Sequence, residues 1–145
     1  MTDLNDTLTK KYSRLYILRG SRDNPEYFKG EFRTGFSNID LVQDNSIINI
    51  ENRRVFFLGG ALSPDRAGRI YGRDYFPDER INFNMNIVKT ASNVDIVVTH
   101  KTPPFIFDSV ENIKEVDSLT GEDPCVGIQI EKESTALNKL RKKLE

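Results

Sequence analysis

The chain has 145 residues, 37% of them hydrophobic and 30% charged, with a formal net charge of −1. This length fits one domain with a sizeable core and leaves no room for two. Because 21 basic side chains oppose 22 acidic ones, no global field attracts nucleic acid or an anionic membrane, and neither partner is expected. A single cysteine, Cys125, cannot form an internal disulfide, so we expect a reduced, cytoplasmic setting.

The first predicted elements are a short amphipathic helix and a buried strand. Apolar side chains recur at a four-residue spacing within residues 4–12, which indicates one helix face. Residues 15–18 form a continuous apolar run, typical of a strand buried on both faces. A charged loop follows directly at the carboxyl end of this strand, made of Gly20, Ser21, Arg22 and Asp23.

Three further strand-like runs follow close together, at residues 39–42, 46–50 and 55–58. The dipeptides Asp44-Asn45 and Glu51-Asn52 lie between them and are typical turn residues. The pattern therefore predicts three adjacent strands in antiparallel pairing.

Gly59-Gly60 opens a long irregular segment that runs to residue 80 and is rich in glycine, proline and arginine. Loops of this length inside a compact domain are usually functional or mobile. A helix is predicted to begin at Pro77, because acidic residues fill its first turn. Its expected apolar face consists of Ile81, Met85 and Val88.

Residues 95–98 form another apolar run, which delivers Thr99-His100 at its carboxyl end. A last helix is predicted after Pro124, with acidic residues ahead of basic ones, as the helix dipole favours. Its expected apolar positions are Leu137, Leu140 and Leu144.

Strands mixed with helices predict an α/β or α+β layered domain. Ligands of such sheets bind beyond the carboxyl ends of the strands, where the loops 20–23 and 99–101 are expected.

Two groups of polar side chains allow two interpretations each. Arg19 and Arg22 could face a phosphate at the strand end, or the loop could be a turn that Asp23 caps. The long segment could hold a phosphorylated ligand, with aromatic side chains stacking on a base, or it could be a salt-bridged loop pinned to the core. Its polar residues are Ser63, Asp65, Arg66, Arg69 and Arg73, and its aromatic residues are Tyr71, Tyr75 and Phe76.

Four separated motifs occur in the order LRG-x-x-D-NPEYF, VFFLGGALSPDRAGR, DYFPDE and DIVVTHKTPPFIF. Together they resemble the middle of a calcineurin-like metallophosphoesterase, over about residues 15–107. In that family one strand ends in Gly-Asn-His-Asp and a later strand ends in a histidine, while the Gly-Gly-Ala stretch occurs in a bacterial and phage branch. The resemblance implies that residues 1–145 form a single partial domain, a metallophosphoesterase-type β-sandwich with flanking helices.

The resemblance also implies a pair of divalent metal ions, such as Mn, Fe, Zn or Mg, of which most ligands are missing here. The family's Asp-x-His and Gly-Asp-x-x-Asp motifs would precede residue 1, and its Gly-His-x-His motif would follow residue 145. Ser21 stands where the family has a metal-binding asparagine, and Arg22 where it has a proton-donating histidine. Only His100 matches a family metal ligand by position. Two-metal hydrolysis needs a bridging carboxylate, and a guanidinium neither binds a cation nor donates a proton readily.

We therefore expect a degenerate or truncated metallophosphoesterase domain without phosphoester hydrolysis of its own. One alternative is a fragment of a split hydrolase, whose metal pair returns when another chain completes it. Another is a non-catalytic module that binds or regulates a partner. A protein partner or a second copy would then cover the missing half of the sandwich. The phosphate-binding candidates are Arg22, Arg66 and Arg69, the metal-ligand candidate is His100, and no catalytic residue is assigned.

Overall fold

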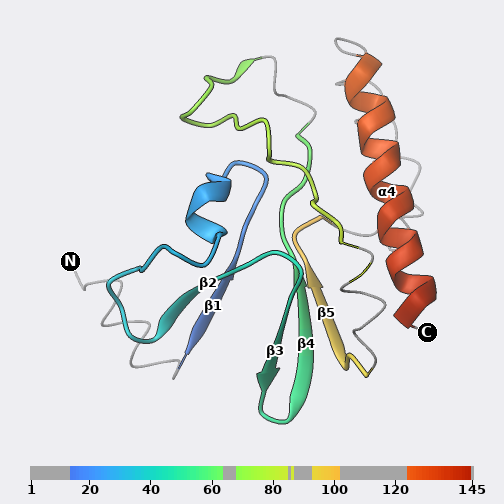
Figure 1. The fold of residues 1–145 in the computed structure, drawn as a ribbon. Helices are drawn as coiled ribbons and strands as arrows, with labels where there is room; N and C mark the ends of the chain where they lie inside the picture. The colour runs from blue at the N-terminus through green and yellow to red at the C-terminus, as the bar shows by residue number, and fades with distance from the viewer. Residues whose placement is uncertain (1–13, 64–67, 85, 87–92, 102–123, 145) are drawn as a thin grey trace.

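A computed structural model describes residues 14–63, 68–84, 86, 93–101 and 124–144. These residues form a small mixed α+β fold, in which a two-stranded sheet, a three-stranded sheet and a long helix lie side by side (Figure 1). The predicted N-terminal helix at residues 4–12 lies outside the described residues. Within the described part of the chain, no helix is both long and apolar enough to cross a membrane.

The two-stranded sheet pairs β1 (Leu15–Leu18) in parallel with β2 (Ile39–Val42). Both strands have the bounds that their apolar runs predict. All four residues of β1 are half-buried, so this strand is less enclosed than its apolar run suggested. In the sequence, the 3₁₀-helix η1 (Pro25–Phe28) lies between β1 and β2 and begins after Asn24. The side-chain oxygen of Asn24 accepts a hydrogen bond from the Glu26 N–H at 3.0 Å.

The three-stranded sheet contains β3 (Ser46–Ile50), β4 (Arg53–Leu58) and β5 (Ile96–Thr99). β3 and β4 form the predicted antiparallel hairpin. Glu51 and Asn52 at its turn have φ angles of 47° and 63°, the positive values that two-residue hairpin turns require. β5 pairs with the other edge of β4 in parallel.

The predicted antiparallel pairing of β2 with β3 is wrong. β2 pairs with β1 in the other sheet, and the three residues that follow β2 carry the chain from one sheet to the other. Asn45 takes a φ of 62° there, and its N–H donates to the Phe57 carbonyl at 2.9 Å. A short polar connection indicates a bend, but it does not decide which strand edge is available for pairing.

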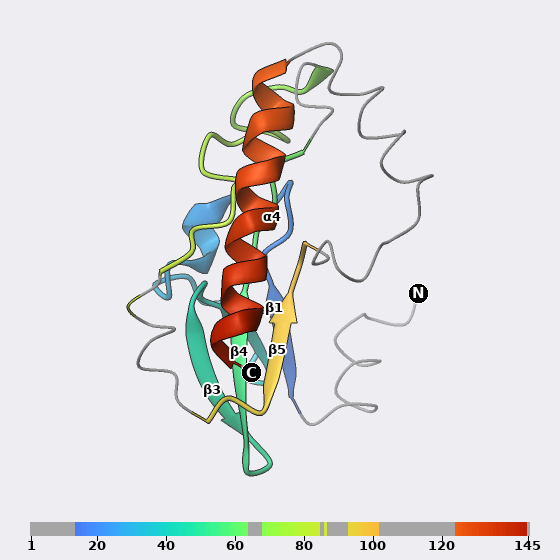
Figure 2. The same ribbon diagram turned by 90° about the vertical axis from the view of Figure 1, so that its right-hand side faces the viewer.

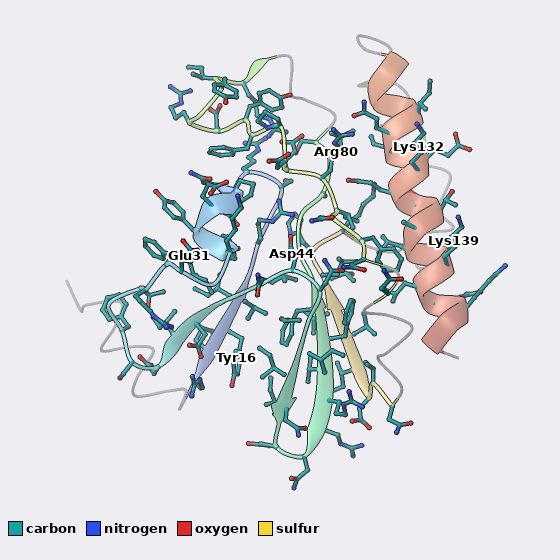
Figure 3. All side chains as sticks on the ribbon, in the orientation of Figure 1. Tyr16, Glu31, Asp44, Arg80, Lys132 and Lys139 are labelled. Carbon is teal, nitrogen blue, oxygen red and sulfur yellow. The ribbon has the colours of Figure 1, made fainter. Side chains whose placement is uncertain are left out.

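β4 is the centre of the core because its side chains alternate between two packed faces. Val55 and Phe57 face the two-stranded sheet, where they pack with Val42. Tyr16 points from β1 toward the same face (Figure 3), and its ring centroid lies 6.3 Å from that of Phe57. The continuous apolar run of β4 therefore reflects burial on both sides.

The opposite face of β4 is covered by α4 (Pro124–Leu144), which lies along the three-stranded sheet (Figure 2). Phe56 and Leu58 pack there with Leu137 and Leu140, each at most 3% exposed. The prediction of a last helix is confirmed, with two of its three expected apolar positions in the core. The side chain of Leu144 lies outside the described residues.

The helix predicted to begin at Pro77 is wrong for residues 77–84, which form turns and irregular backbone. Their carbonyl groups are used elsewhere: those of Asp78, Glu79 and Arg80 accept hydrogen bonds from the Arg19 side chain. Since each backbone group needs a partner, this buried guanidinium competes with the helical hydrogen bonds. Asn86 is helical, while Met85 and Val88 lie outside the described residues.

Candidate functional site

Three loops meet beyond the carboxyl ends of β1, β4 and β5. Two of them, 20–23 and 99–101, were expected at strand ends. The Gly60 N–H donates to the Arg19 carbonyl at 2.8 Å, and the His100 N–H donates to the Leu58 carbonyl at 3.3 Å. A Cβ atom on Gly59 would lie 2.9 Å from both Cβ and the carbonyl oxygen of Arg19. The glycine pair is therefore what allows the loop after β4 to pack against the loop after β1.

The structure brings His100 next to the loop of Gly20, Ser21 and Asp23, although 79 positions separate His100 from Ser21. The Ser21 N–H donates to His100 Nε2 at 3.2 Å. Asp23 Oδ2 accepts a hydrogen bond from the Gly20 N–H at 2.7 Å. A Cβ on Gly20 would lie 3.2 Å from this carboxylate oxygen and 3.4 Å from His100 Cε1. The imidazole and the carboxylate thus both border Gly20.

This arrangement does not fit the metal pair that the family resemblance implies. The lone pair of His100 Nε2 accepts the Ser21 N–H, so it is not available to a metal ion. If Nδ1 bound the metal instead, Nε2 would carry the proton and meet the Ser21 N–H. Among the residues that the structure describes, no three His, Cys, Asp or Glu side chains gather closely enough to hold a metal ion.

Arg19 does not face a phosphate site, because it is only 2% exposed. Its Nε and Nη2 donate to Asp44 Oδ2 at 3.1 and 2.7 Å, and its other donors reach the three carbonyls of residues 78–80. Figure 3 places Asp44 where the chain passes from β2 to β3. The second oxygen of Asp44 accepts from the Gly59 N–H at 3.0 Å. This ion pair between the buried Arg19 and the partly buried Asp44 holds the ends of three strands together.

The other phosphate-binding candidates are dispersed. Arg22 is exposed and lines a cavity beside η1, whereas Arg66 lies outside the described residues. Arg69 has a side chain only 5% exposed and forms an ion pair with Glu79 Oε2 at 3.2 Å. Arg73 forms a second ion pair with Asp74 at 3.0 Å. These two ion pairs match the interpretation of the long segment as a salt-bridged loop.

The long segment is less firmly pinned by its aromatic side chains than the sequence suggested. Tyr71 is 73% exposed and contacts the ring of Tyr75 edge-on, with 6.5 Å between centroids. Tyr75 and Phe76 are half-buried. The segment is instead held by polar contacts to its backbone and to Arg69.

Two buried glutamates were missed by the sequence reasoning. Glu79 is fully buried and its Oε1 accepts from the Ser63 N–H at 3.1 Å. Glu133, which is 6% exposed, accepts from the N–H groups of Leu62 and Ile81 at 3.1 and 3.0 Å. Lys101 Nζ also donates to Glu133, at 2.9 Å. One signal could have identified Glu133: it precedes Leu137 by four positions and therefore shares the apolar face of α4.

Comparison of the chain with protein-family models, with curated proteins and with solved structures gives no match. The likeness to calcineurin-like metallophosphoesterases therefore depends on the four sequence motifs alone. Membership of that family stays a prediction.

Proposed function

We propose that this chain is a degenerate calcineurin-like metallophosphoesterase domain that does not hydrolyse phosphoesters by itself. The observation that carries the proposal is the hydrogen bond from the Ser21 N–H to His100 Nε2. By the family resemblance, these two positions hold metal ligands, whereas in this chain the backbone N–H of Ser21 occupies the imidazole nitrogen of His100. Arg22 occupies the position of the family's proton donor, where a guanidinium is a poor general acid.

The layering of the chain also supports this ancestry. β4 packs against the β1–β2 sheet on one face and against α4 on the other, as expected for part of a β-sandwich with a flanking helix. Two of the motif loops, 20–23 and 99–101, meet beyond the carboxyl ends of β1 and β5. The proposed domain thus keeps the framework of a phosphoesterase and lacks its chemistry.

The test is an assay of the purified 145-residue chain with Mn²⁺ and either an aryl phosphate or an aryl phosphodiester. We expect no hydrolysis above that of Mn²⁺ alone, because no cluster of His, Cys, Asp or Glu able to hold a metal pair is found in the described part of the chain. The double variant Ser21→Asn, Arg22→His restores the family side chains but keeps the backbone N–H of residue 21 on His100 Nε2, so it too is expected to remain inactive. Metal-dependent turnover by the unmodified chain would contradict the proposal.

A second candidate function, a fragment completed by another chain, is favoured by the exposure of β5. Ile96, Val97 and Val98 are 46%, 39% and 36% exposed, and β5 lies at the edge of its sheet in the described part of the chain. An exposed apolar edge strand is a template for pairing with another polypeptide. The partner would carry the missing carboxylate motifs.

The DNA that flanks the gene tests this candidate directly. A neighbouring reading frame that encodes Asp-x-His and Gly-Asp-x-x-Asp, and whose product co-purifies with this chain, would support it. Val97→Lys should abolish co-purification, because it places a charge on the apolar strand, whereas Val97→Ile keeps the strand apolar and should retain it. Unrelated flanking frames would count heavily against the split-enzyme function.

A further inference from the structure

A cavity of about 410 Å³ lies against the β1–β2 sheet, between η1 and the turn at residues 72–76. Its floor is formed by Ile17 and Leu41, which are direct neighbours in the parallel register. The volume falls in the range of about 300–1,000 Å³ that is usual for small-molecule sites. The Ser21–His100 pair does not line the cavity, which adjoins the 20–23 loop through Arg22 and Asp23.

The walls of the cavity combine aromatic rings with two arginine side chains, of which Arg73 also pairs with Asp74 at 3.0 Å. Tyr27 and Phe28 come from η1, and Phe76 comes from the opposite side. Tyr27 is held by Phe32, whose ring centroid lies 4.7 Å away. The charged residues of the lining are two arginines and one aspartate, and the aspartate already accepts the Gly20 N–H. These charged residues are Arg22, Arg73 and Asp23.

Hydrogen bonds within each wall order the backbone on both sides of the cavity. On the η1 side, Asn24 caps the Glu26 N–H at 3.0 Å. On the other side, the Ile70 carbonyl accepts from three successive N–H groups at 3.1 to 3.2 Å, and the Gly72 N–H donates to the Tyr75 carbonyl at 3.0 Å. A ligand that enters such a preformed site loses little affinity to the ordering of loops. The three donors to the Ile70 carbonyl are Arg73, Asp74 and Tyr75.

We propose that this cavity binds a small ligand that carries a flat aromatic ring and one anionic group. The ring would lie on the apolar floor between the aromatic walls, since aromatic pairs favour offset or edge-on contact. The anion would face the guanidinium groups, whose planar donors match a phosphate or a carboxylate. An uncharged ring or a free anion would use only half of this lining.

The experiment titrates the full chain with four probes, followed by backbone amide NMR shifts: adenosine 5′-monophosphate, 2-naphthoate, adenosine and inorganic phosphate. We expect an aromatic anion to bind at least about tenfold more tightly than adenosine or phosphate alone. Shifts should concentrate at Tyr27 and at residues 72–76. If only the nucleotide binds, the anionic group is a phosphate, and if only the naphthoate binds, it is a carboxylate.

Arg73→Ala is expected to weaken binding of the aromatic anion by about tenfold, and Arg73→Lys by less, because the charge remains. Arg53→Ala is the matched control: the two arginine side chains are 68% and 67% exposed, and each pairs with an aspartate. Circular dichroism of each variant checks the fold. If Arg73→Ala disrupts the turn, the comparison uses Arg73→Lys, which keeps the positive charge beside Asp74. Binding of neither aromatic anion below about 1 mM, or equal losses in Arg53→Ala and Arg73→Ala, would overturn the proposal.

Discussion

Arg19 joins four segments of the chain through one side chain. Its guanidinium binds Asp44, which follows β2, and the carbonyls of residues 78–80, while its own carbonyl accepts from Gly60. A planar fork of five N–H donors suits this task, whereas a lysine could not reach the same set of acceptors. In the sequence, Arg19 stood out as a candidate phosphate ligand, but its burial makes it a structural residue.

Arg19→Ala is expected to lower the free energy of unfolding by about 3–5 kcal/mol, because it leaves the Asp44 carboxylate and three carbonyls without their donor. The matched control is Arg14→Ala. Arg14 also links β1 to β2, through Asp40 at 2.6 Å, but its side chain is 55% exposed, so solvent replaces its contact. Urea denaturation of both variants measures the difference. Equal losses would show that Arg19 is not the link inferred here.

At the scale of the element, the turn at residues 70–75 depends on one carboxylate. The pKa of Asp74 lies below its ordinary value of 3.8, because the Ile70 N–H donates to the carboxylate and Arg73 adds a second hydrogen bond. The folded turn therefore favours the ionised form. Its stabilisation by Asp74 is fully present above the unfolded pKa near 3.8 and is lost as the pH falls through the folded pKa.

We expect Asp74 to become protonated only at a pH below 3.8. The Ile70 amide resonance should shift over the same pH range. Asp74→Asn should remove that pH dependence and weaken the turn at neutral pH, since the neutral amide is a poorer acceptor for Ile70 and Arg73. Asp95→Asn is a control that leaves this turn unchanged. The measurement is an NMR titration of the Ile70 and Asp74 amides. An Asp74 carboxyl that titrates at or above 3.8 would contradict the expected shift.

For the whole molecule, Glu133 connects the helix layer to the site end of the sheet. Its carboxylate accepts from the backbone of Leu62, near the start of the long segment, and of Ile81, directly after its end. It also accepts from the ammonium group of Lys101 in the loop after β5. The long segment is therefore fixed through α4. Since Lys132 and Lys139 lie on the exposed side of the same helix (Figure 3), the two faces of α4 have separate roles.

Glu133→Gln is expected to lower the free energy of unfolding by about 1–3 kcal/mol, because the carboxamide cannot neutralise Lys101 and turns a donor toward other donors. The amides of Leu62 and Ile81 should then exchange with deuterium faster than in the unmodified chain. Glu131→Gln, on the exposed side of α4, should change neither quantity. Unchanged exchange at both amides in Glu133→Gln would mean that α4 does not hold the long segment.

The elements were largely predictable because local apolar runs encode them. The runs at residues 15–18, 39–42 and 46–50 became strands with the predicted bounds. The helix expected at Pro77 failed for a nonlocal reason: its carbonyls bind Arg19, about 60 positions away. The site was predictable only in part, because the sequence placed the 20–23 loop and His100 at strand ends but not the hydrogen bond between them.

The sequence by itself determined the strands, the last helix, and the gathering of polar loops beyond the strand ends, since each depends on the pattern of neighbouring residues. Only the tertiary structure decided which strands pair, where Arg19, Glu79 and Glu133 are buried, and that Ser21 binds His100. These features join residues far apart in the chain. Their energies depend on desolvation and on the geometry of partners, which no local pattern contains.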